Sequence, residues 1–186
     1  KTLNASMFYN CSTLSTVTLP ADLVIIEKYA FEKTALVSVE IPDTVTYIGN
    51  SAFYDCASLS SINIPSGITE ITPFMLRGCS SLTAIEIPES VTTIAQAAFA
   101  YTGLKEVYIP DSVTYMENNM FYGCTSLEKA RISTNIIYLP ECTFYECSNL
   151  TSLTMATNTE VIGEWAFAKT GFTSFGLAKF TVKEVG

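Results

Sequence analysis

Cysteine is the residue type whose spacing most invites a chemical role in this chain. Five of the six cysteines recur at one position of a repeat: Cys11, Cys56, Cys79, Cys124 and Cys147. If the repeats stack like strands, neighbouring positions lie about 4.8 Å apart, and a disulfide tolerates that Cα separation. Parallel stacked side chains nevertheless have poor Cβ geometry for a disulfide. The spacing by itself is thus compatible with both disulfides and free thiols.

Threonine fills the same position in the other three repeats, at Thr34, Thr102 and Thr170. A position shared by cysteine and threonine requires a small buried side chain, which favours buried, reduced thiols. Zinc is disfavoured because the C-x₂-C spacing of zinc sites is missing. Cys142 lies off this position, two residues before Phe144, and is predicted to be the most exposed thiol.

Other catalytic or metal-binding groups are sparse. Histidine is absent, which removes Ser-His-Asp and Cys-His nucleophiles and the usual general base. Asp43, Glu89 and Asp111 share one repeat position and suggest a calcium stripe, but Ser66 interrupts it, so a solvated acidic edge is favoured. We predict no catalytic, cofactor-binding or metal-binding residue, and no enzymatic activity.

A short internal repeat organises all of these positions. Its marker is a phenylalanine, once a leucine: Phe8, Phe31, Phe53, Leu76, Phe99, Phe121, Phe144 and Phe167. A fixed period in the twenties indicates a stacked solenoid. The threonine-containing repeats are every third one along the chain, which indicates a duplicated unit of three coils.

One coil shows how the chain is expected to fold. Leu59, Ile62 and Ile64 give the L-x-x-I-x-I strand pattern, with alternate side chains facing the core. Pro65 then ends the strand, because proline cannot donate to a sheet ladder. A short apolar pair, as in Ile68 and Ile71, predicts a second strand. The Ala-Phe segment on the other face is expected to form one helical or 3₁₀ turn.

The run from Ile48 to Ile68 resembles the BspA-like class of leucine-rich repeats. Its pattern, I-G-x-x-A-F-x-x-C-x-x-L-x-x-I-x-I-P-x-x-V, repeats over essentially the whole chain and weakens after Ile132, where the proline is lost. The resemblance implies a right-handed solenoid, α/β or mainly β, of about eight coils with parallel strands. It also implies a secreted or surface-attached protein that binds other proteins or host surfaces, without shared catalytic residues.

Composition is consistent with one array spanning residues 1–186. The repeat pattern is cut at both ends, so we expect a part of a larger protein, with Phe172, Phe175 and Phe180 as a partial cap. A net charge of −8 with ten scattered basic residues disfavours nucleic-acid binding. No apolar run reaches about 18 residues, so no membrane-spanning segment is expected.

The outward strand positions are the expected recognition face. In the first four coils these positions are mostly small and polar, whereas the fifth and sixth coils carry Lys105, Glu106, Tyr108, Lys129 and Arg131. Tyrosine and arginine are enriched at binding hot spots, and here they occupy one position in neighbouring coils. The alternative is that nearby carboxylates neutralise the basic groups and leave only a surface ion-pair cluster.

Tyrosines and N-x-[ST] sequons also recur in the chain. Tyrosines recur on the second strand (Tyr47, Tyr115, Tyr138) and after the phenylalanine (Tyr9, Tyr54, Tyr122, Tyr145), and we expect both groups to pack between coils rather than bind sugars. Three N-x-[ST] sequons, at Asn4, Asn10 and Asn149, matter only if a eukaryotic source secretes the protein.

The sequence thus predicts a non-enzymatic, adhesin-like binding module at the cell surface or outside the cell. Its expected partner is a protein or a glycan, with no cofactor. The alternative is a structural spacer without a ligand of its own. The sequence names neither the partner nor the oligomeric state.

Overall fold

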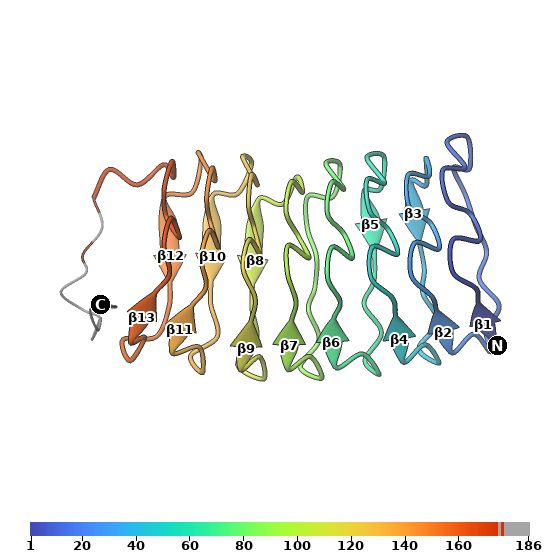
Figure 1. The fold of residues 1–186 in the computed structure, drawn as a ribbon, viewed down its shortest axis with the longest axis horizontal. Coiled ribbons are helices and arrows are strands. Elements are labelled where there is room, and N and C mark those ends of the chain that lie inside the picture. Colours follow the sequence, from blue (N-terminus) through green and yellow to red (C-terminus); the bar gives the residue numbers. More distant parts are fainter. Residues whose placement is uncertain (175, 177–186) are drawn as a thin grey trace.

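The computed structural model describes residues 1–174 and 176, which form one stack of coils (Figure 1). Two rows of short parallel strands run along the stack. The post-proline row holds β1 (Thr2–Leu3), β2 (Ile25–Ile26), β4 (Tyr47–Ile48), β6 (Glu70–Ile71), β7 (Thr93–Ile94), β9 (Tyr115–Met116), β11 (Tyr138–Leu139) and β13 (Val161–Ile162). The pre-proline row holds β3 (Ser38–Val39), β5 (Ser61–Ile62), β8 (Glu106–Tyr108), β10 (Lys129–Arg131) and β12 (Ser152–Thr154).

Among the described residues, five coils have both predicted strands, and the predicted parallel pairing is confirmed. Eight post-proline strands enclose about seven complete turns, against the eight coils expected. Pre-proline strands are missing at residues 16–18 and 84–86, where strands were also expected. The predicted cap residues Phe175 and Phe180 lie outside the described residues.

The strand ladders break at intervals that follow the three-coil unit. In the post-proline row, β1, β2 and β4 form one ladder, β6, β7 and β9 a second, and β11 and β13 a third. The wider steps from β4 to β6 and from β9 to β11 are visible in Figure 1. Tyr47 and Tyr115, which begin the strands before the two breaks, occupy one repeat position three coils apart. The duplicated unit inferred from sequence thus has a structural counterpart.

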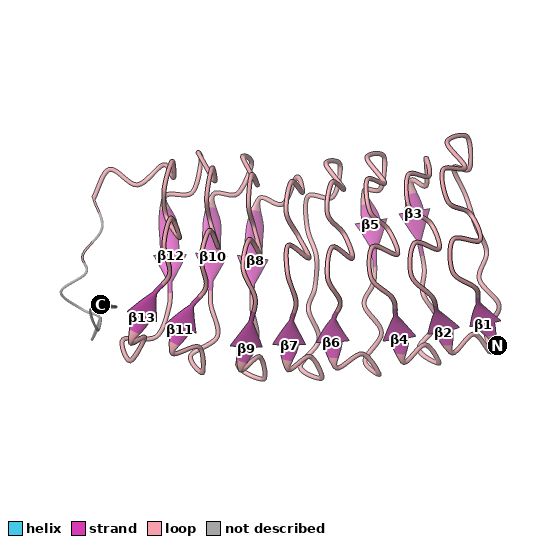
Figure 2. Ribbon diagram, in the orientation of Figure 1, coloured by secondary structure: helices cyan, strands magenta, loops and turns pink. Residues whose placement is uncertain are grey.

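The segment around each phenylalanine was wrongly predicted to be helical. No helix is present in the described part of the chain (Figure 2). Residues two before and two after the phenylalanine position instead have positive φ in all eight coils, as at Asn119 (φ 64°) and Gly123 (φ 69°). Left-handed residues at both positions prevent a right-handed helical turn.

These left-handed residues let the segment bond to the next coil. The backbone N–H groups of Asn119, Phe121 and Gly123 donate to the carbonyls of Glu141, Thr143 and Tyr145, at 2.8–3.0 Å. The equivalent three bonds join every adjacent pair of coils from the first to the last. The sequence shows only that this segment is short and apolar. Its conformation is determined by the backbone hydrogen bonds to the next coil.

The core is a single column of apolar side chains along the stack. Leu36, Leu59, Leu82, Leu104, Leu127 and Leu150 are all fully buried. The phenylalanine rings stack face to face: centroids of Phe99 and Phe121 are 5.7 Å apart, and those of Phe121 and Phe144 are 5.5 Å apart. Leu76 interrupts this ring stack without leaving the core.

We predict that Phe121→Ala lowers the free energy of unfolding by about 3–5 kcal/mol, because the substitution leaves a cavity between two stacked rings. Phe8→Ala is the matched control. Phe8 is only half-buried and stacks on one ring, Phe31, so its loss should be much smaller. Urea unfolding followed by circular dichroism measures both, and equal losses would contradict the ring stack as a source of stability.

Candidate functional site

The structure brings four of the five predicted recognition residues together on β8 and β10. These strands pair in parallel, with Lys129 opposite Glu106 and Arg131 opposite Tyr108. Their side chains face outward because the intervening Val107 and Ala130 are buried in the core. Lys105 lies just before β8, is exposed, and forms no ion pair within the described residues.

The arginine and the tyrosine stack as predicted. The Arg131 guanidinium lies 4.5 Å from the centre of the Tyr108 ring. Tyr108 nevertheless keeps 52% of its surface exposed, so the ring remains available on its outer side. Arg131 also donates to the Ile109 carbonyl at 3.1 Å and to Asp111 at 2.8 Å, which fixes the guanidinium in place.

Most charged side chains on this patch form ion pairs. Lys129 forms an ion pair with Glu106 at 2.8 Å, with both side chains about 60% exposed. Such exposed pairs contribute little to stability, but they hold the two side chains side by side. Neutralisation by neighbouring carboxylates, the alternative raised from the sequence, therefore applies to Lys129 and Arg131 and not to Lys105.

Asp111 connects the patch to the coil that lacks the proline. Its carboxylate accepts from Arg131 and from the backbone N–H of Thr134 at 2.7 Å, and its carbonyl accepts from Asn135. The buried Ser133, at the missing proline position, donates to the Val113 carbonyl at 2.6 Å. In this coil, hydrogen bonds therefore stabilise the turn that a proline forms in other coils.

The same interactions lower the pKa of Asp111 from its ordinary value of 3.8 to about 2, chiefly through the hydrogen bond from Arg131. The predicted acidic edge is in this coil a hydrogen-bonded anchor. Within the described residues, no group of three or more His, Cys, Asp or Glu side chains is placed to hold a metal ion. The same residues contain no helix long and apolar enough to cross a membrane.

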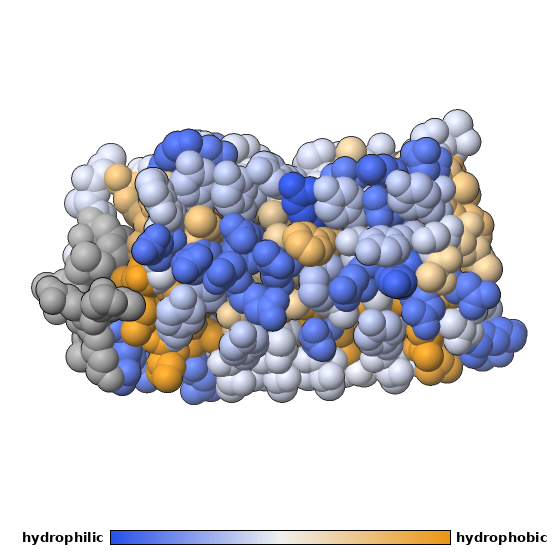
Figure 3. Space-filling model, in the orientation of Figure 1, coloured by the Kyte–Doolittle hydropathy of each residue, from blue (hydrophilic) through white to orange (hydrophobic). Residues whose placement is uncertain are grey.

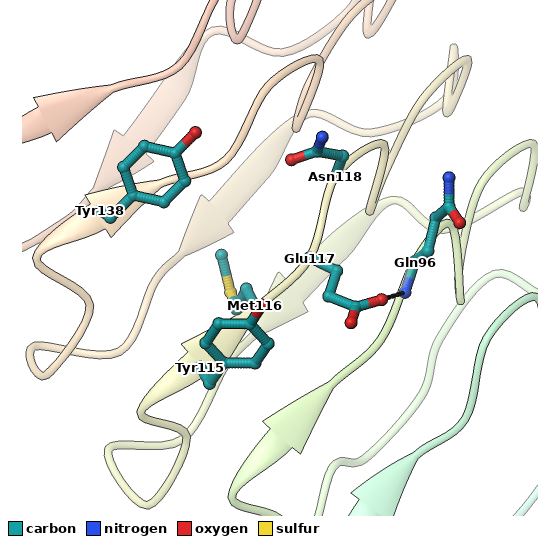
Figure 4. Close-up of a pocket in the computed structure, with 6 residues that line it drawn as sticks. All are labelled: Gln96, Tyr115, Met116, Glu117, Asn118 and Tyr138. Carbon is teal, nitrogen blue, oxygen red and sulfur yellow. Dashed lines mark hydrogen bonds between the residues drawn. The ribbon is translucent and has the colours of Figure 1, made fainter. Parts of the chain in front are cut away.

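A shallow groove of about 320 Å³ lies on the other side of the coils, at the ladder break between β9 and β11. Figure 3 views the molecule from this side and shows hydrophilic side chains gathered just above β9 and β11. The repeat pattern in the sequence does not predict this groove. The groove is lined by Gln96, Tyr115, Met116, Glu117, Asn118 and Tyr138 (Figure 4).

Comparison with known proteins agrees with the repeat. The family described as BspA type leucine rich repeat region matches residues 1–128 and 78–186, with six copies. The chain belongs to the BspA-type leucine-rich repeat family. No curated protein matches the sequence.

Two solved structures, from Bacteroides ovatus and T. pallidum, show the same fold. A leucine-rich repeat protein from Bacteroides ovatus is 28% identical with a TM-score of 0.63, and the match covers 91% of this chain and 56% of that one. A leucine-rich repeat protein from T. pallidum is 27% identical with a TM-score of 0.71, covering 82% and 74%. A third, from Faecalibacterium prausnitzii, is described as a leucine-rich cell surface protein; it is 26% identical with a TM-score of 0.48, covering 83% and 57%. This chain thus spans little more than half of the B. ovatus protein.

The tyrosines of the BspA-type repeat fall into two groups. After the phenylalanine, Tyr122 and Tyr145 stack between coils with centroids 4.9 Å apart, as predicted. On the second strand, Tyr47, Tyr115 and Tyr138 were wrongly expected to pack between coils, since 44%, 57% and 45% of their surfaces are exposed. The sequence alone could have predicted this exposure. Each of these tyrosines comes one position before a buried core residue, and neighbouring side chains of a strand point to opposite faces.

The cysteines of the repeat are structural. Cys56, Cys79, Cys124 and Cys147 are buried and free, as predicted. Each thiol donates to the phenylalanine carbonyl of the preceding coil, as from Cys124 to Phe99 at 3.1 Å. Burial raises the pKa of Cys124 to about 11, which disfavours the reactive thiolate. Cys142, predicted to be the most exposed thiol, is only half-exposed, and the exposed thiol is instead Cys11 in the first coil.

We predict that only Cys11 and Cys142 react rapidly with Ellman's reagent in the folded protein, because the other four thiols are buried and protonated. The variant with Cys11→Ser and Cys142→Ser should react only after urea is added. Rapid reaction of that variant without denaturant would contradict the burial of the cysteine column.

We also predict a pH-dependent loss of stability on replacing Asp111→Asn. Because the folded-state pKa of Asp111 is lowered to about 2, its stabilising effect is present above about pH 4 and lost as pH falls toward 2. The gap between wild type and variant in urea unfolding should therefore be widest at pH 6 and close toward pH 2. Asp43→Asn, at the same repeat position, is the control and should change stability little at pH 6. A gap that stays constant with pH would refute the anchoring role.

Proposed function

We propose that this chain is a non-enzymatic binding module, displayed at a cell surface or outside the cell, which recognises a protein or a glycan partner. The fold supports the proposal because a solenoid presents one long regular surface. The BspA-type family is generally a binding or scaffold fold rather than a catalytic one. The chain would act as one repeat array within a longer protein.

The observation that carries the proposal is the Tyr108–Arg131 pair. A half-exposed aromatic ring lies against an arginine that two acceptors and the ring itself hold in position. Side chains fixed before binding lose little conformational entropy in a complex. Lys105 supplies a positive charge beside them, and Lys129 and Glu106 form a polar rim of the kind that surrounds hot spots.

A structural spacer remains the second candidate. It is favoured by the small polar side chains that dominate the outward positions of the earlier coils, such as Thr16, Ser38 and Ser61. A spacer needs stiffness rather than a ligand, and stiffness is already supplied by the core and by the unbroken backbone bonding around the phenylalanine positions. The two candidates differ in whether the patch on β8 and β10 binds anything.

We predict that replacing Tyr108→Ala and Arg131→Ala together weakens partner binding at least about ten-fold, because hot-spot aromatic and arginine side chains dominate interface energies. Binding is measured by biolayer interferometry against panels of purified extracellular glycoproteins and of immobilised glycans. The matched control replaces Thr18→Ala and Glu40→Ala, which occupy the same outward position in the first two coils.

The fold of both variants is checked by circular dichroism and thermal unfolding. Unchanged affinity in the Tyr108 and Arg131 variant, or no binding to either panel by the wild type, would favour the spacer. Equal losses in the control variant would show that the effect does not belong to this patch.

A further inference from the structure

We infer that the groove between β9 and β11 is a second, separate binding site, and that its ligand is an uncharged oligosaccharide. The inference rests on the proposed binding role of the chain but uses a different surface. The patch on β8 and β10 belongs to the pre-proline row, whereas the groove lies on the post-proline row and the turns that follow it. The two sites can therefore be tested independently.

The groove exists because the strand ladder is interrupted. β9 pairs with β7 and β11 pairs with β13, but in the described part of the chain no ladder bonds join β9 to β11. Tyr115 and Tyr138 occupy the same outward position on these neighbouring strands, one on each side of the break. The wider step between the strands leaves room between and above the two rings (Figure 4).

The two tyrosines are suited to sugar rings. They are 57% and 45% exposed, and neither ring stacks on another aromatic side chain within the described residues. An exposed tyrosine offers a flat apolar face with a polar end. The C–H face of a pyranose matches such a surface, while its hydroxyl groups need hydrogen-bonding partners around the rim.

Those partners are present and already held in place. Glu117 accepts a hydrogen bond from the backbone N–H of Gln96 at 2.8 Å, the bond drawn dashed in Figure 4. Asn118 donates to Glu141 at 3.3 Å, which orients its amide, and its carbonyl oxygen is an acceptor. Gln96 is exposed and offers both a donor and an acceptor. Neighbouring hydroxyl groups of a sugar both donate and accept hydrogen bonds. Amide and carboxylate groups that are already held in place can bind them with little loss of entropy.

The negative charge at the groove favours an uncharged sugar over an anionic one. Glu117 lines the groove and Glu141 lies beside it, while none of the six lining residues is a lysine or an arginine. An anionic sugar, such as a sialylated or sulfated one, would meet like charge in the groove itself, where no lining residue is cationic. Each of the two carboxylates is oriented by one N–H donor from the protein and keeps acceptor sites free for sugar hydroxyls.

A second hollow of about 200 Å³ adjoins the groove and shares Gln96 with it. Its lining includes two tyrosines, Tyr101 and Tyr122, the amide of Asn119, and Arg77, whose guanidinium lies 4.9 Å from the centre of the Tyr101 ring. Two adjoining hollows with aromatic side chains in each fit a chain of sugar units rather than a monosaccharide. The structure therefore favours an oligosaccharide that runs across several coils.

The duplicated three-coil unit provides an internal comparison. The equivalent ladder break, between β4 and β6, has Tyr47 at the position of Tyr115. The position of Tyr138 is there Glu70, and the position of Glu117 is Gly49. The first break therefore lacks the second tyrosine and the equivalent of Glu117, and it forms no equivalent site. The proposed site depends on these side chains and not on the ladder break alone.

The test measures binding of cellotetraose, chitotetraose and lacto-N-tetraose to the whole chain by isothermal titration calorimetry and by NMR line broadening. We expect at least one to bind with a Kd below about 1 mM. Tyr115→Ala combined with Tyr138→Ala should weaken that binding at least about ten-fold. Tyr115→Phe with Tyr138→Phe, which keeps the rings, should retain most of it.

Tyr47→Ala is the matched control, since Tyr47 is a comparably exposed tyrosine at the equivalent position. It should leave sugar affinity unchanged, as should Tyr108→Ala with Arg131→Ala. Loss of sugar binding in the latter variant would assign it to the strand face and overturn the groove site, leaving the proposed function intact.

Three other results would overturn the inference. One is no binding of any of the three sugars at about 10 mM, well above the expected Kd. Another is an equal loss in Tyr47→Ala. The third is tighter binding of 6′-sialyllactose or of a lysine- and arginine-rich peptide than of the neutral sugars, which would identify a ligand of a different charge.

Discussion

The backbone ladder beneath the phenylalanine stack is the constraint on which the rest of the structure depends. At every junction between coils, three N–H groups around the phenylalanine donate to the next coil. Buried backbone groups must find partners, so the chain has to return to the same place once in every repeat. That requirement fixes the left-handed residues on both sides of the phenylalanine and brings the rings to 5.3–6.0 Å from one another.

The remaining columns follow from this stacking. Once coils are in register, each side chain lies above its equivalent, and the environment repeats along the stack. The cysteine column shows the result, because a thiol or a hydroxyl at this position is buried and bonds to a phenylalanine carbonyl. Both are small donors, but the threonines bond to the phenylalanine of their own coil and the cysteines to that of the preceding coil. A chemical role for the cysteines is therefore not required to explain their spacing.

Both proposed binding sites lie where the regularity of the repeat changes. The patch on β8 and β10 arises because large side chains replace small ones at outward positions that the ladder leaves free. The groove arises because the post-proline ladder is broken once in every three coils, and one of these breaks carries two tyrosines. A regular scaffold thus sets the spacing, while side chains that do not affect stacking set the chemistry.

The sequence by itself determined the period, the inward leucine and isoleucine columns, the two strands per coil and the burial of four cysteines. These follow from local pattern and side-chain alternation, which stacking only reinforces. The sequence also placed Tyr108 next to Arg131, because register follows directly from the repeat length. It failed where a short apolar segment was compatible with several conformations, and the expected helical turn proved to be an inter-coil ladder with residues such as Asn119 in the left-handed region. Only the tertiary structure decided that Asp111 anchors the coil without a proline, and that the ladder opens between Tyr115 and Tyr138. Both depend on contacts between successive coils, which a pattern within one repeat does not contain.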